Sequence, residues 1–573
     1  MIRLGRIVAF VVKNASEHRG KASAPSVLPR VFSPQEITLK DSSVLEKLGY
    51  DEDLEIERKE INNAVNDVVD KINTLPQSRI DELFEAFSFS CGGAKKGEKA
   101  IPPLRGGIES GVITRFPPEP NGYLHIGHAK AAFIDLAYAR KYGGRFILRF
   151  DDTNPSKESS IYYTVQREDL KALGIEWDKE HCTSDDIEKL YEFCGRGIKN
   201  GLLYVCTCTQ EKIREGRKTG KSCECRNRSS EENLADFESM LNGSLNAIVR
   251  LRGDLTSKNT ALRDPTMFRI MEDNHPRQGD RYRVWPTYDF AGPIEDSISG
   301  VTHAFRSKEY ELRDSVYFMI LESLGLRKPV LMEFSRLEIK DMPISKRIMK
   351  PMIERKEVEG WDDIRLPTIR GLLRRGIRPE AIKDFVLAMG TSKSESKPSI
   401  GILESINRKL LDPVAKRYFF VPDPIKLEVK NAPELRVGIK LHPSEDLGER
   451  ELNTKGIFYV SRNDIGEGGE IRLKDLYNIR IDRIEDDRAS GEFVSMKMKG
   501  REKKIQWVTE DSFEIRVIKS EGLLKDDRVI SIKTIEGLLE RAGEEIRENE
   551  VVQFERFGFC RRDSKEIFCF AHR

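Results

Sequence analysis

The chain has 573 residues, more than one hydrophobic core organises, so its length predicts about three to five domains. Charged residues make up 34% and apolar residues 38%, which excludes a disordered chain. The best apolar run, residues 7–12, is far shorter than the ~18 residues of a membrane span and makes a poor signal peptide, so we expect no membrane partner and a cytoplasmic location. The net charge of +2 neither supports nor excludes an RNA partner.

Residues 1–105 are a predicted appended helical region with a linker. Pro25, Pro29 and Pro34 break its start, and apolar residues then recur at helical spacing over residues 61–75. A glycine- and lysine-rich stretch at 91–99 is typical of a linker. Two interpretations stay open: a module that docks a protein or RNA partner, or an extension that only stabilises the fold.

The next segment predicts a strand, a helix and a second strand. Residues 112–116 are β-prone, and the prolines and glycine of 117–122 predict an irregular loop. A helix is predicted over 125–142, ended by Gly143-Gly144, and residues 145–150 form the next strand. This βαβ order predicts a parallel sheet.

The rest of the chain divides into further predicted domains. Residues 205–290 interrupt the α/β pattern, which occupies 106–204 and resumes over 291–350. Residues 351–411 are predicted to be helical and rich in arginine. After residue 412, β-prone runs at 418–421, 457–460, 493–497 and 513–518 predict one or two β-barrels within 412–573. The expected fold class is therefore multidomain α/β plus β.

His125-Ile126-Gly127-His128 stands at the start of the first predicted helix. A helix N-terminus offers free N–H groups and the positive end of a dipole, which suit a phosphate. Gly127 leaves room for a flat ring, and the two histidines can donate to phosphate oxygens as charge develops. A chance His-x-x-His metal pair or two capping histidines are the alternatives, but the βαβ setting favours a nucleotide site.

A second motif, Ile344-Ser345-Lys346-Arg347, follows Pro343 in a predicted loop. A mobile loop that carries Lys and Ser can fold over phosphates and neutralise a departing pyrophosphate. Taken alone, the motif fits an ordinary solvated basic loop better.

Together the two motifs resemble the signature sequences of class I aminoacyl-tRNA synthetases, the second in its Ser-Lys-Arg variant. Four longer stretches resemble the glutamyl/glutaminyl subgroup of that family: residues 115–124, 148–155, 285–290 and 360–376. The resemblance covers about residue 108 to residue 573, with the motifs in the family's order. The β-rich part is similar to the archaeal and eukaryotic branch, which reads the anticodon with barrels.

This resemblance implies a Rossmann-like catalytic domain with an inserted acceptor-stem-binding domain, a helical stem-contact region and anticodon-binding β-barrels. It implies that glutamate attacks the α-phosphorus of ATP, which brings Mg²⁺, and that the glutamyl group then passes to the 3′-terminal adenosine of tRNA(Glu), or also of tRNA(Gln). Because the first nucleophile is already a carboxylate and the adenylate is already activated, positioning and charge stabilisation should dominate catalysis.

The resemblance also assigns site residues. It places the chemistry on His125, Gly127, His128 and Lys346, and ATP on Pro117, Ile126, Ser345 and Arg347. Glutamate is expected at Arg115, Asp151, Tyr288 and Arg306. Within that set, Asp151 would hold the α-amino group and Arg115 a substrate carboxylate. Contacts with tRNA are expected at Glu119, Arg417, Arg472 and Lys474, whereas Leu312 stands where several relatives carry an acidic stem-contacting residue.

Arg306 decides between glutamate and glutamine. Glutamyl enzymes of the family carry arginine at this position and glutaminyl enzymes a small neutral residue. A guanidinium can bind a γ-carboxylate in a bidentate, charge-assisted way and is poorly satisfied by an amide. A surface or phosphate-facing arginine is the alternative. The runner-up function is a glutaminyl-tRNA synthetase; a small-molecule adenylyltransferase and a non-catalytic RNA-binding paralogue fit the barrels and the intact motifs less well.

Four of the nine cysteines cluster in the predicted insertion, as Cys206-Thr207-Cys208 and Cys223-Glu224-Cys225. Four thiolates in one short segment can close a tetrahedral Zn²⁺ site, although the commoner spacing is Cys-x-x-Cys. The resemblance implies a structural Zn²⁺ in this insertion. Reduced free thiols are the alternative, and a cytosolic disulfide is disfavoured.

Overall fold

The computed structural model describes residues 101–104, 110–340, 342, 344–395, 397–498, 500, 502–521, 524–525, 528–529 and 531–573. The chain forms two compact units, residues 1–100 and 101–573, and only the second falls within this description. The predicted N-terminal helix and linker therefore lie outside the described residues.

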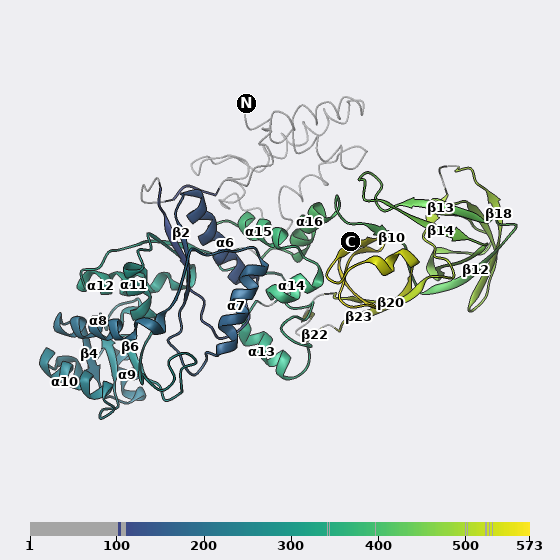
Figure 1. Cartoon of the computed structure of the whole chain (residues 1–573). Coiled ribbons are helices and arrows are strands. Elements are labelled where there is room, and N and C mark those ends of the chain that lie inside the picture. The colour runs from purple at the N-terminus through teal and green to yellow at the C-terminus, as the bar shows by residue number, and fades with distance from the viewer. Residues whose placement is uncertain are drawn as a thin grey trace, which may run out of the picture. The chain divides into compact units, whose positions relative to one another are not determined.

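A parallel sheet forms the centre of the α/β region (Figure 1). Strands β1 (Ile113–Phe116), β2 (Arg145–Phe150) and β3 (Lys179–Cys182) pair in the order β1-β2-β3, and β8 (His303–Ser307) pairs with β9 (Val330–Phe334), all in parallel. Thr302 donates its N–H to the carbonyl oxygen of Ile113 at 2.9 Å and so joins the two halves. The predicted βαβ unit is confirmed.

Helix α6 (Ile126–Lys141) connects β1 to β2 and begins at the first motif. His125 is its N-cap, and the rings of His125 and His128 each accept a backbone N–H, as in a capping box. The helix ends just before Gly143, which has φ +58. At Gly144 a Cβ would lie 1.8 Å from the carbonyl oxygen of Val112, so only glycine lets α6 return this closely to β1.

The segment between the two halves of the parallel sheet folds around an antiparallel sheet of its own. Its strands are β4 (Leu203–Cys206), β5 (Ile248–Leu251), β6 (Thr266–Ile270) and β7 (Val284–Pro286), in the order β4-β5-β6-β7. The accompanying helices are α8 (Ile187–Lys199), α9 (Gln210–Thr219) and α10 (Ser230–Leu241). Trp285 is fully buried in the core that this sheet shares with α8 and α10.

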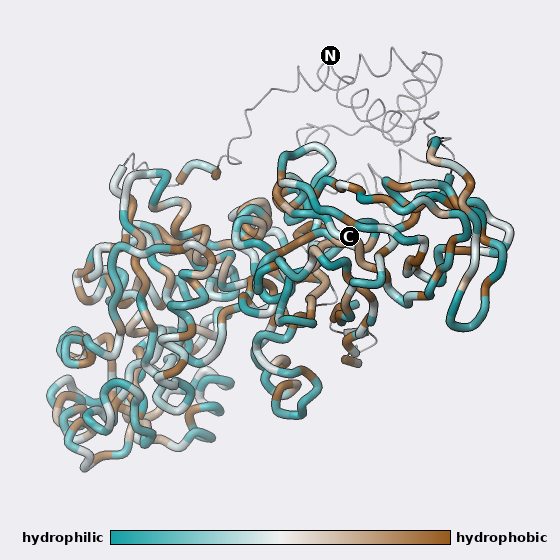
Figure 2. The backbone as a smooth tube through the Cα atoms, turned by 45° about the vertical axis from the view of Figure 1, so that its right-hand side comes forward, coloured by the Kyte–Doolittle hydropathy of each residue, from teal (hydrophilic) through white to brown (hydrophobic). Residues whose placement is uncertain are grey.

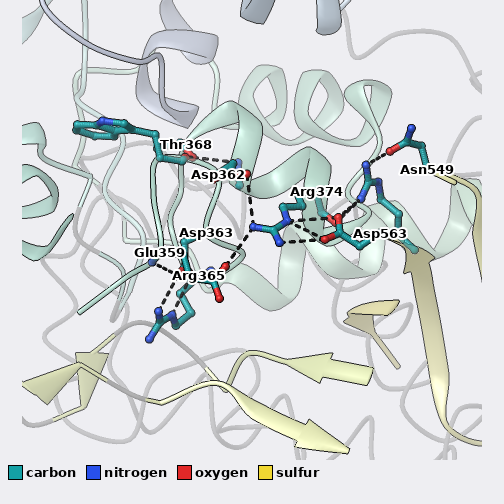
Figure 3. Close-up of polar contacts among 11 residues, drawn as sticks. Glu359, Asp362, Asp363, Arg365, Thr368, Arg374, Asn549 and Asp563 are labelled. Carbon is teal, nitrogen blue, oxygen red and sulfur yellow. Dashed lines mark hydrogen bonds and ion pairs between the residues drawn. The ribbon is translucent and has the colours of Figure 1, made fainter. Parts of the chain in front are cut away.

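Three more helices complete the α/β region: α7 (Ser160–Ala172), α11 (Tyr288–Ile298) and α12 (Asp314–Ser323). Four helices follow it: α13 (Lys346–Glu354), α14 (Ile369–Arg375), α15 (Pro379–Ala388) and α16 (Ile400–Leu411). Extended backbone before α14 pairs with the first motif: Ile126 donates its N–H to Pro367 and Ile369 to Leu124. At the other end of α14, Arg374 pairs with Asp563 at 2.9 Å (Figure 3). The short helix α14 thus connects the nucleotide motif to the C-terminal β region.

Two larger sheets build the C-terminal region. One contains β10 (Arg417–Tyr418), β11 (Phe420–Pro422), β20 (Phe513–Lys519), β23 (Lys533–Leu539), β24 (Val551–Phe554), β25 (Gly558–Arg562) and β26 (Ile567–His572). The other contains β12 (Pro424–Lys430), β15 (Ile457–Ser461), β16 (Glu470–Leu473), β17 (Asn478–Ile484), β18 (Arg488–Ser495) and β19 (Lys503–Ile505). The hairpin β13 (Leu435–Lys440) and β14 (Glu449–Thr454) and the pair β21 (Leu524–Lys525) and β22 (Arg528–Val529) complete it.

Several of these strands, among them β12, β14 and β24, have the period-two burial expected of barrel-like sheets. In β12, Ile425, Leu427 and Val429 are buried and alternate with more exposed neighbours. Hydrophobic and hydrophilic stretches accordingly alternate along the chain in this region (Figure 2). The predicted α/β plus β-barrel fold class is therefore confirmed. None of the described helices combines the length and the apolar character that a bilayer crossing requires.

Candidate active site

A cavity of about 430 Å³ lies where the parallel strands end. Phe116 closes β1, Asp151 follows β2 and Thr183 follows β3, and all three line the cavity. The carboxyl ends of parallel strands are where doubly wound folds bind their ligands. Five of the predicted site residues line it: Pro117, Glu119, His128, Asp151 and Tyr288.

The two histidines of the first motif stack with ring centroids 3.8 Å apart. Nδ1 of His125 accepts the Gly127 N–H at 3.1 Å, and Nδ1 of His128 accepts the His125 N–H at 3.2 Å. Burial and the nearby charge of Arg336 lower the pKa of both rings, that of His128, which also faces Lys346, to about 4. Both rings are therefore neutral at pH 7, and each has its Nε2–H left to donate.

The backbone between the histidines leaves little room for a side chain. A Cβ on Gly127 would lie 3.0 Å from Cε1 of His125 and 3.5 Å from Cγ2 of Ile344. A side chain at position 127 would therefore crowd the His125 ring, and glycine leaves that space free. Ile126 points away and is fully buried in the core.

The second motif opens helix α13, so its prediction as a loop is wrong at Lys346 and Arg347. Met349 and Met352 of this helix pack into a small apolar cluster, and Ser345 is the N-cap. Lys346 donates to Oδ1 of Asn121 at 2.7 Å, and burial lowers its pKa to about 8. A Cβ on Gly122 would lie 2.3 Å from Cε of Lys346. Lys346 of the second motif therefore lies against the Asn121–Gly122 turn, which comes just before the first motif. Arg347 is exposed.

One buried carboxylate organises the layer beneath the cavity. Asp296 of α11 accepts from Nε of Arg115 at 2.8 Å and from Nη1 of Arg149 at 2.6 Å. Burial alone would raise the pKa of Asp296, but the two guanidinium groups hold it below its usual value. Nε of Arg149 then donates to Asp151 at 2.6 Å. Arg115 lies in this layer, with Nη1 on the carbonyl oxygen of Phe305, and Asp151 lines the cavity above it.

Arg306 lies behind the aromatic part of the cavity wall. Its guanidinium stands over the rings of Tyr310 and Tyr317, 5.3 Å from each centroid. Only 4% of the residue is exposed, and Nη2 donates to the carbonyl oxygen of Tyr310 at 3.3 Å. Among the described residues, Nε and Nη1 have no hydrogen-bond partner. A buried guanidinium with unmet donors beside Tyr288 and Tyr310 suits an anionic group.

The four clustered cysteines gather between β4 and the short helix at Glu224–Asn227. Their Sγ atoms all lie within 4.8 Å of one another, and the pairs Cys206–Cys223 and Cys208–Cys225 are 3.9 Å apart. Zn–S bonds of about 2.3 Å in a tetrahedron require sulfur atoms about 3.8 Å apart, so the geometry fits a zinc ion. Burial would raise the pKa of Cys225, but hydrogen bonds to Thr207 and Cys208 lower it to about 7.

The side chains expected to contact tRNA differ in how many of their hydrogen-bond donors already have a partner within the protein. Arg472 is buried, with Nη1 on Asn478 at 2.9 Å and Nη2 on the carbonyl oxygen of Leu476 at 2.9 Å. Lys474 pairs with Glu555. Arg417 donates Nη2 to Asp412 at 3.0 Å, but its Nε finds no partner among the described residues. Of these three, Arg417 has the most unused donor capacity.

The sequence did not predict a site role for several residues that line the cavity. Asn121 and Lys157 stand within or near quoted motifs, and the asparagine of the Pro-Asn-Gly turn was a usable signal. Arg269 reaches the cavity from β6 of the insertion, and no local pattern marks it. Asp296 lies eight residues after Tyr288 in a helix, where only the fold reveals its partners.

Comparisons with known proteins point to the same family in the α/β part and in the C-terminal β part of the chain. Residues 111–413 match the family described as tRNA synthetases class I (E and Q), catalytic domain, and residues 415–499 and 504–563 match two anti-codon binding domains of the same class. The glutamate–tRNA ligase of Cenarchaeum symbiosum is 40% identical over 99% of each chain. Those of Nitrosopumilus maritimus and Pyrococcus horikoshii are 41% and 40% identical, each over 98% of both chains.

Proposed function

Because the chain belongs to the class I tRNA synthetases for glutamate and glutamine, we propose that it is a glutamate–tRNA ligase, which forms glutamyl-adenylate from L-glutamate and ATP and transfers the glutamyl group to tRNA(Glu). The curated relatives support glutamate as the amino acid over nearly the full length of the chain.

The observation that carries this choice is the unmet hydrogen-bonding capacity of Arg306. Nε and Nη1 make no hydrogen bond to a described residue, although Nη1 lies 3.4 Å from Oδ1 of Asp314, and the neighbours Tyr288 and Tyr310 line the cavity. A γ-carboxylate would bind this buried cation by a charge-assisted contact, whereas the amide of glutamine brings one acceptor oxygen and an NH₂ group that meets a cation. Asp151 lines the same cavity and would accept a hydrogen bond from the α-amino group.

In the first step the glutamate α-carboxylate attacks the α-phosphorus of ATP and pyrophosphate leaves. The neutral rings of His125 and His128 would donate hydrogen bonds to phosphate oxygens at the start of α6, where the dipole also favours negative charge. Lys346 lies across the turn after the Pro-rich loop and would neutralise charge on the departing group. Mg²⁺ would enter with ATP and shield its phosphates.

The cysteine cluster would hold one structural zinc ion through Cys206, Cys208, Cys223 and Cys225. Arg250 supports this, because its Nη1 approaches Sγ of Cys206 at 3.9 Å and offsets the negative charge that four thiolates carry. The cluster belongs to the insertion and not to the cavity, so the ion would hold the insertion together.

Aminoacylation with purified tRNA(Glu) and tRNA(Gln), each with glutamate and with glutamine, tests the proposal. We expect charging of tRNA(Glu) with glutamate. Charging of tRNA(Gln) with glutamate as well would make the enzyme non-discriminating, and charging only with glutamine would overturn the proposal.

A further inference from the structure

The buried carboxylate of Asp296 accepts hydrogen bonds from three different elements of the α/β region. Its Oδ1 accepts from Nε of Arg115 on β1 at 2.8 Å and from Nη1 of Arg149 on β2 at 2.6 Å. Its Oδ2 accepts from the hydroxyl of Tyr317 on α12 at 3.0 Å. Asp296 is 1% exposed and does not line the cavity, so it acts on a substrate through its partners.

Arg149 links Asp296 to Asp151, the residue expected to accept from the α-amino group. Nε of Arg149 donates to Oδ1 of Asp151 at 2.6 Å, and Nη2 lies 3.4 Å from Oδ2. A guanidinium is rigid and planar, so the bond that holds its Nη1 on Asp296 also fixes the edge that Asp151 contacts. The position of Asp151 at the cavity therefore depends on Asp296 through one rigid side chain.

Asp296 also affects the charge that Asp151 can offer. Within these ion pairs, Arg115 and Arg149 carry two positive charges and Asp296 and Asp151 two negative ones. Buried charges are weakly screened, so without the charge of Asp296 the two guanidinium groups would oppose an ammonium group bound to Asp151. Asp296 thus leaves the charge of Asp151 available to the α-amino group.

Tyr317 links Asp296 to Arg306, the residue expected to bind the γ-carboxylate. The guanidinium of Arg306 lies over the Tyr317 ring, 5.3 Å from its centroid. A ring face attracts a cation without occupying its N–H donors, and Nε and Nη1 of Arg306 have no hydrogen-bond partner among the described residues. Because the Tyr317 hydroxyl is bound to Asp296, the ring that supports Arg306 is held in one place.

We propose that Asp296 is a positioning residue for the amino acid. Through Arg149 it places Asp151 for the α-amino group, and through Tyr317 it places Arg306 for the γ-carboxylate. This inference rests on the proposed glutamate pocket. Both ends of glutamate are then held relative to one buried carboxylate, which sets the distance between the two binding groups before the substrate arrives.

Three non-reactive adenylate analogues separate the two ends: 5′-O-(glutamylsulfamoyl)adenosine, its glutaminyl counterpart, and a glutaryl counterpart that lacks the α-amino group. Calorimetry gives their dissociation constants. The preference for the glutamyl over the glutaminyl analogue reports the γ-carboxylate end, and the preference for the glutamyl over the glutaryl analogue reports the α-amino end. A general loss of active protein affects all three analogues alike and leaves both preferences unchanged.

Tyr317→Phe keeps the ring and removes only the hydroxyl that binds Asp296. It should lower the γ-carboxylate preference by about two- to tenfold, as for the loss of one hydrogen bond, and leave the α-amino preference unchanged. Asp296→Asn keeps an acceptor oxygen but loses the charge, and should lower both preferences by about tenfold or more.

The matched control is Tyr204→Phe, which breaks another buried tyrosine–aspartate hydrogen bond, 2.9 Å long, to Asp264 in the insertion. It should change neither preference. Melting temperatures show whether each variant is folded, and Tyr317→Phe decides alone if Asp296→Asn does not fold.

Arg306→Ala tests the pocket itself and should lower the γ-carboxylate preference strongly. If it does so while Tyr317→Phe leaves that preference unchanged, the inference is overturned and the glutamate pocket stands. Equal weakening of all three analogues in Asp296→Asn would reduce Asp296 to a structural role and also overturn the inference. If Arg306→Ala leaves the preference unchanged, the proposed pocket is wrong, and the inference falls with it.

Discussion

At the scale of single residues, Lys346 links the two signature motifs through a side chain whose charge is easily lost. Burial lowers its pKa to about 8, so the protonated form that can neutralise pyrophosphate dominates below pH 8 and disappears as the pH rises through that value. We expect kcat/KM for ATP, in ATP–pyrophosphate exchange, to fall above about pH 8. Lys346→Arg keeps its charge and should show no such fall, even if its rate is lower. Parallel profiles for the two proteins would contradict this role.

Arg306→Ala should raise the KM for glutamate far more than the KM for ATP. The substrate's γ-carboxylate would lose its counter-charge in a site where only 4% of the arginine is exposed, and removing one partner of a buried charged pair costs about 2–5 kcal/mol. Steady-state exchange kinetics with each substrate varied in turn measure the effect. Equal losses for glutamate and ATP would remove Arg306 from the side-chain pocket.

The sequence identified the residues of the site that stand in long motifs. Asp151 and Tyr288 lie 137 positions apart and still line one cavity, because both follow or begin elements of the predicted α/β pattern. Asp296 and Tyr317 belong to no motif. Their importance comes from the partners that packing brings to them, Arg115, Arg149 and Arg306, and no spacing along the chain encodes those contacts.

At the scale of elements, the insertion should depend on its cysteine cluster. We expect about one zinc per chain by elemental analysis, and Cys225→Ser should release it. Because the ion would stabilise the insertion, the variant should lose thermal stability there while exchange activity falls much less. Full retention of zinc in Cys225→Ser, or metal-free wild-type protein, would contradict the assignment.

Helix boundaries show what sequence patterns predict at this scale. The helix predicted over 125–142 is observed as Ile126–Lys141, since a capping histidine and two glycines mark its ends. The segment at Lys346 was expected to be a loop, because its basic residues suggest solvent. The observed helix buries Met349 and Met352 against apolar residues as far along the chain as Leu366, and local sequence does not reveal such partners.

At the scale of the whole molecule, Arg417 is the first residue of β10, where the chain passes from α16 into the C-terminal β region. One of its donors is unused, and we expect Arg417→Ala to reduce charging of tRNA(Glu) while adenylate formation stays intact. A contact with a base should cost about 1–3 kcal/mol and depend on the base presented, by analogy with base readout in DNA. Aminoacylation of anticodon variants by mutant and wild type distinguishes the cases. A uniform loss would assign Arg417 to the RNA backbone, and no loss would remove it from the interface.

The strand order of the seven-stranded sheet bears on how the protein is made. Its strands β10 and β11 emerge from the ribosome early, but their partners β24 and β23 follow only after the whole six-stranded sheet has been synthesised. The strand β26 follows β24 and β25 along the chain, and the carbonyl oxygen of its Ala571 accepts from Arg375 of α14. During translation the α/β region and the six-stranded sheet can fold while β10 and β11 remain unpaired, so the contact between α14 and β26 forms only after the rest of both sheets has been synthesised.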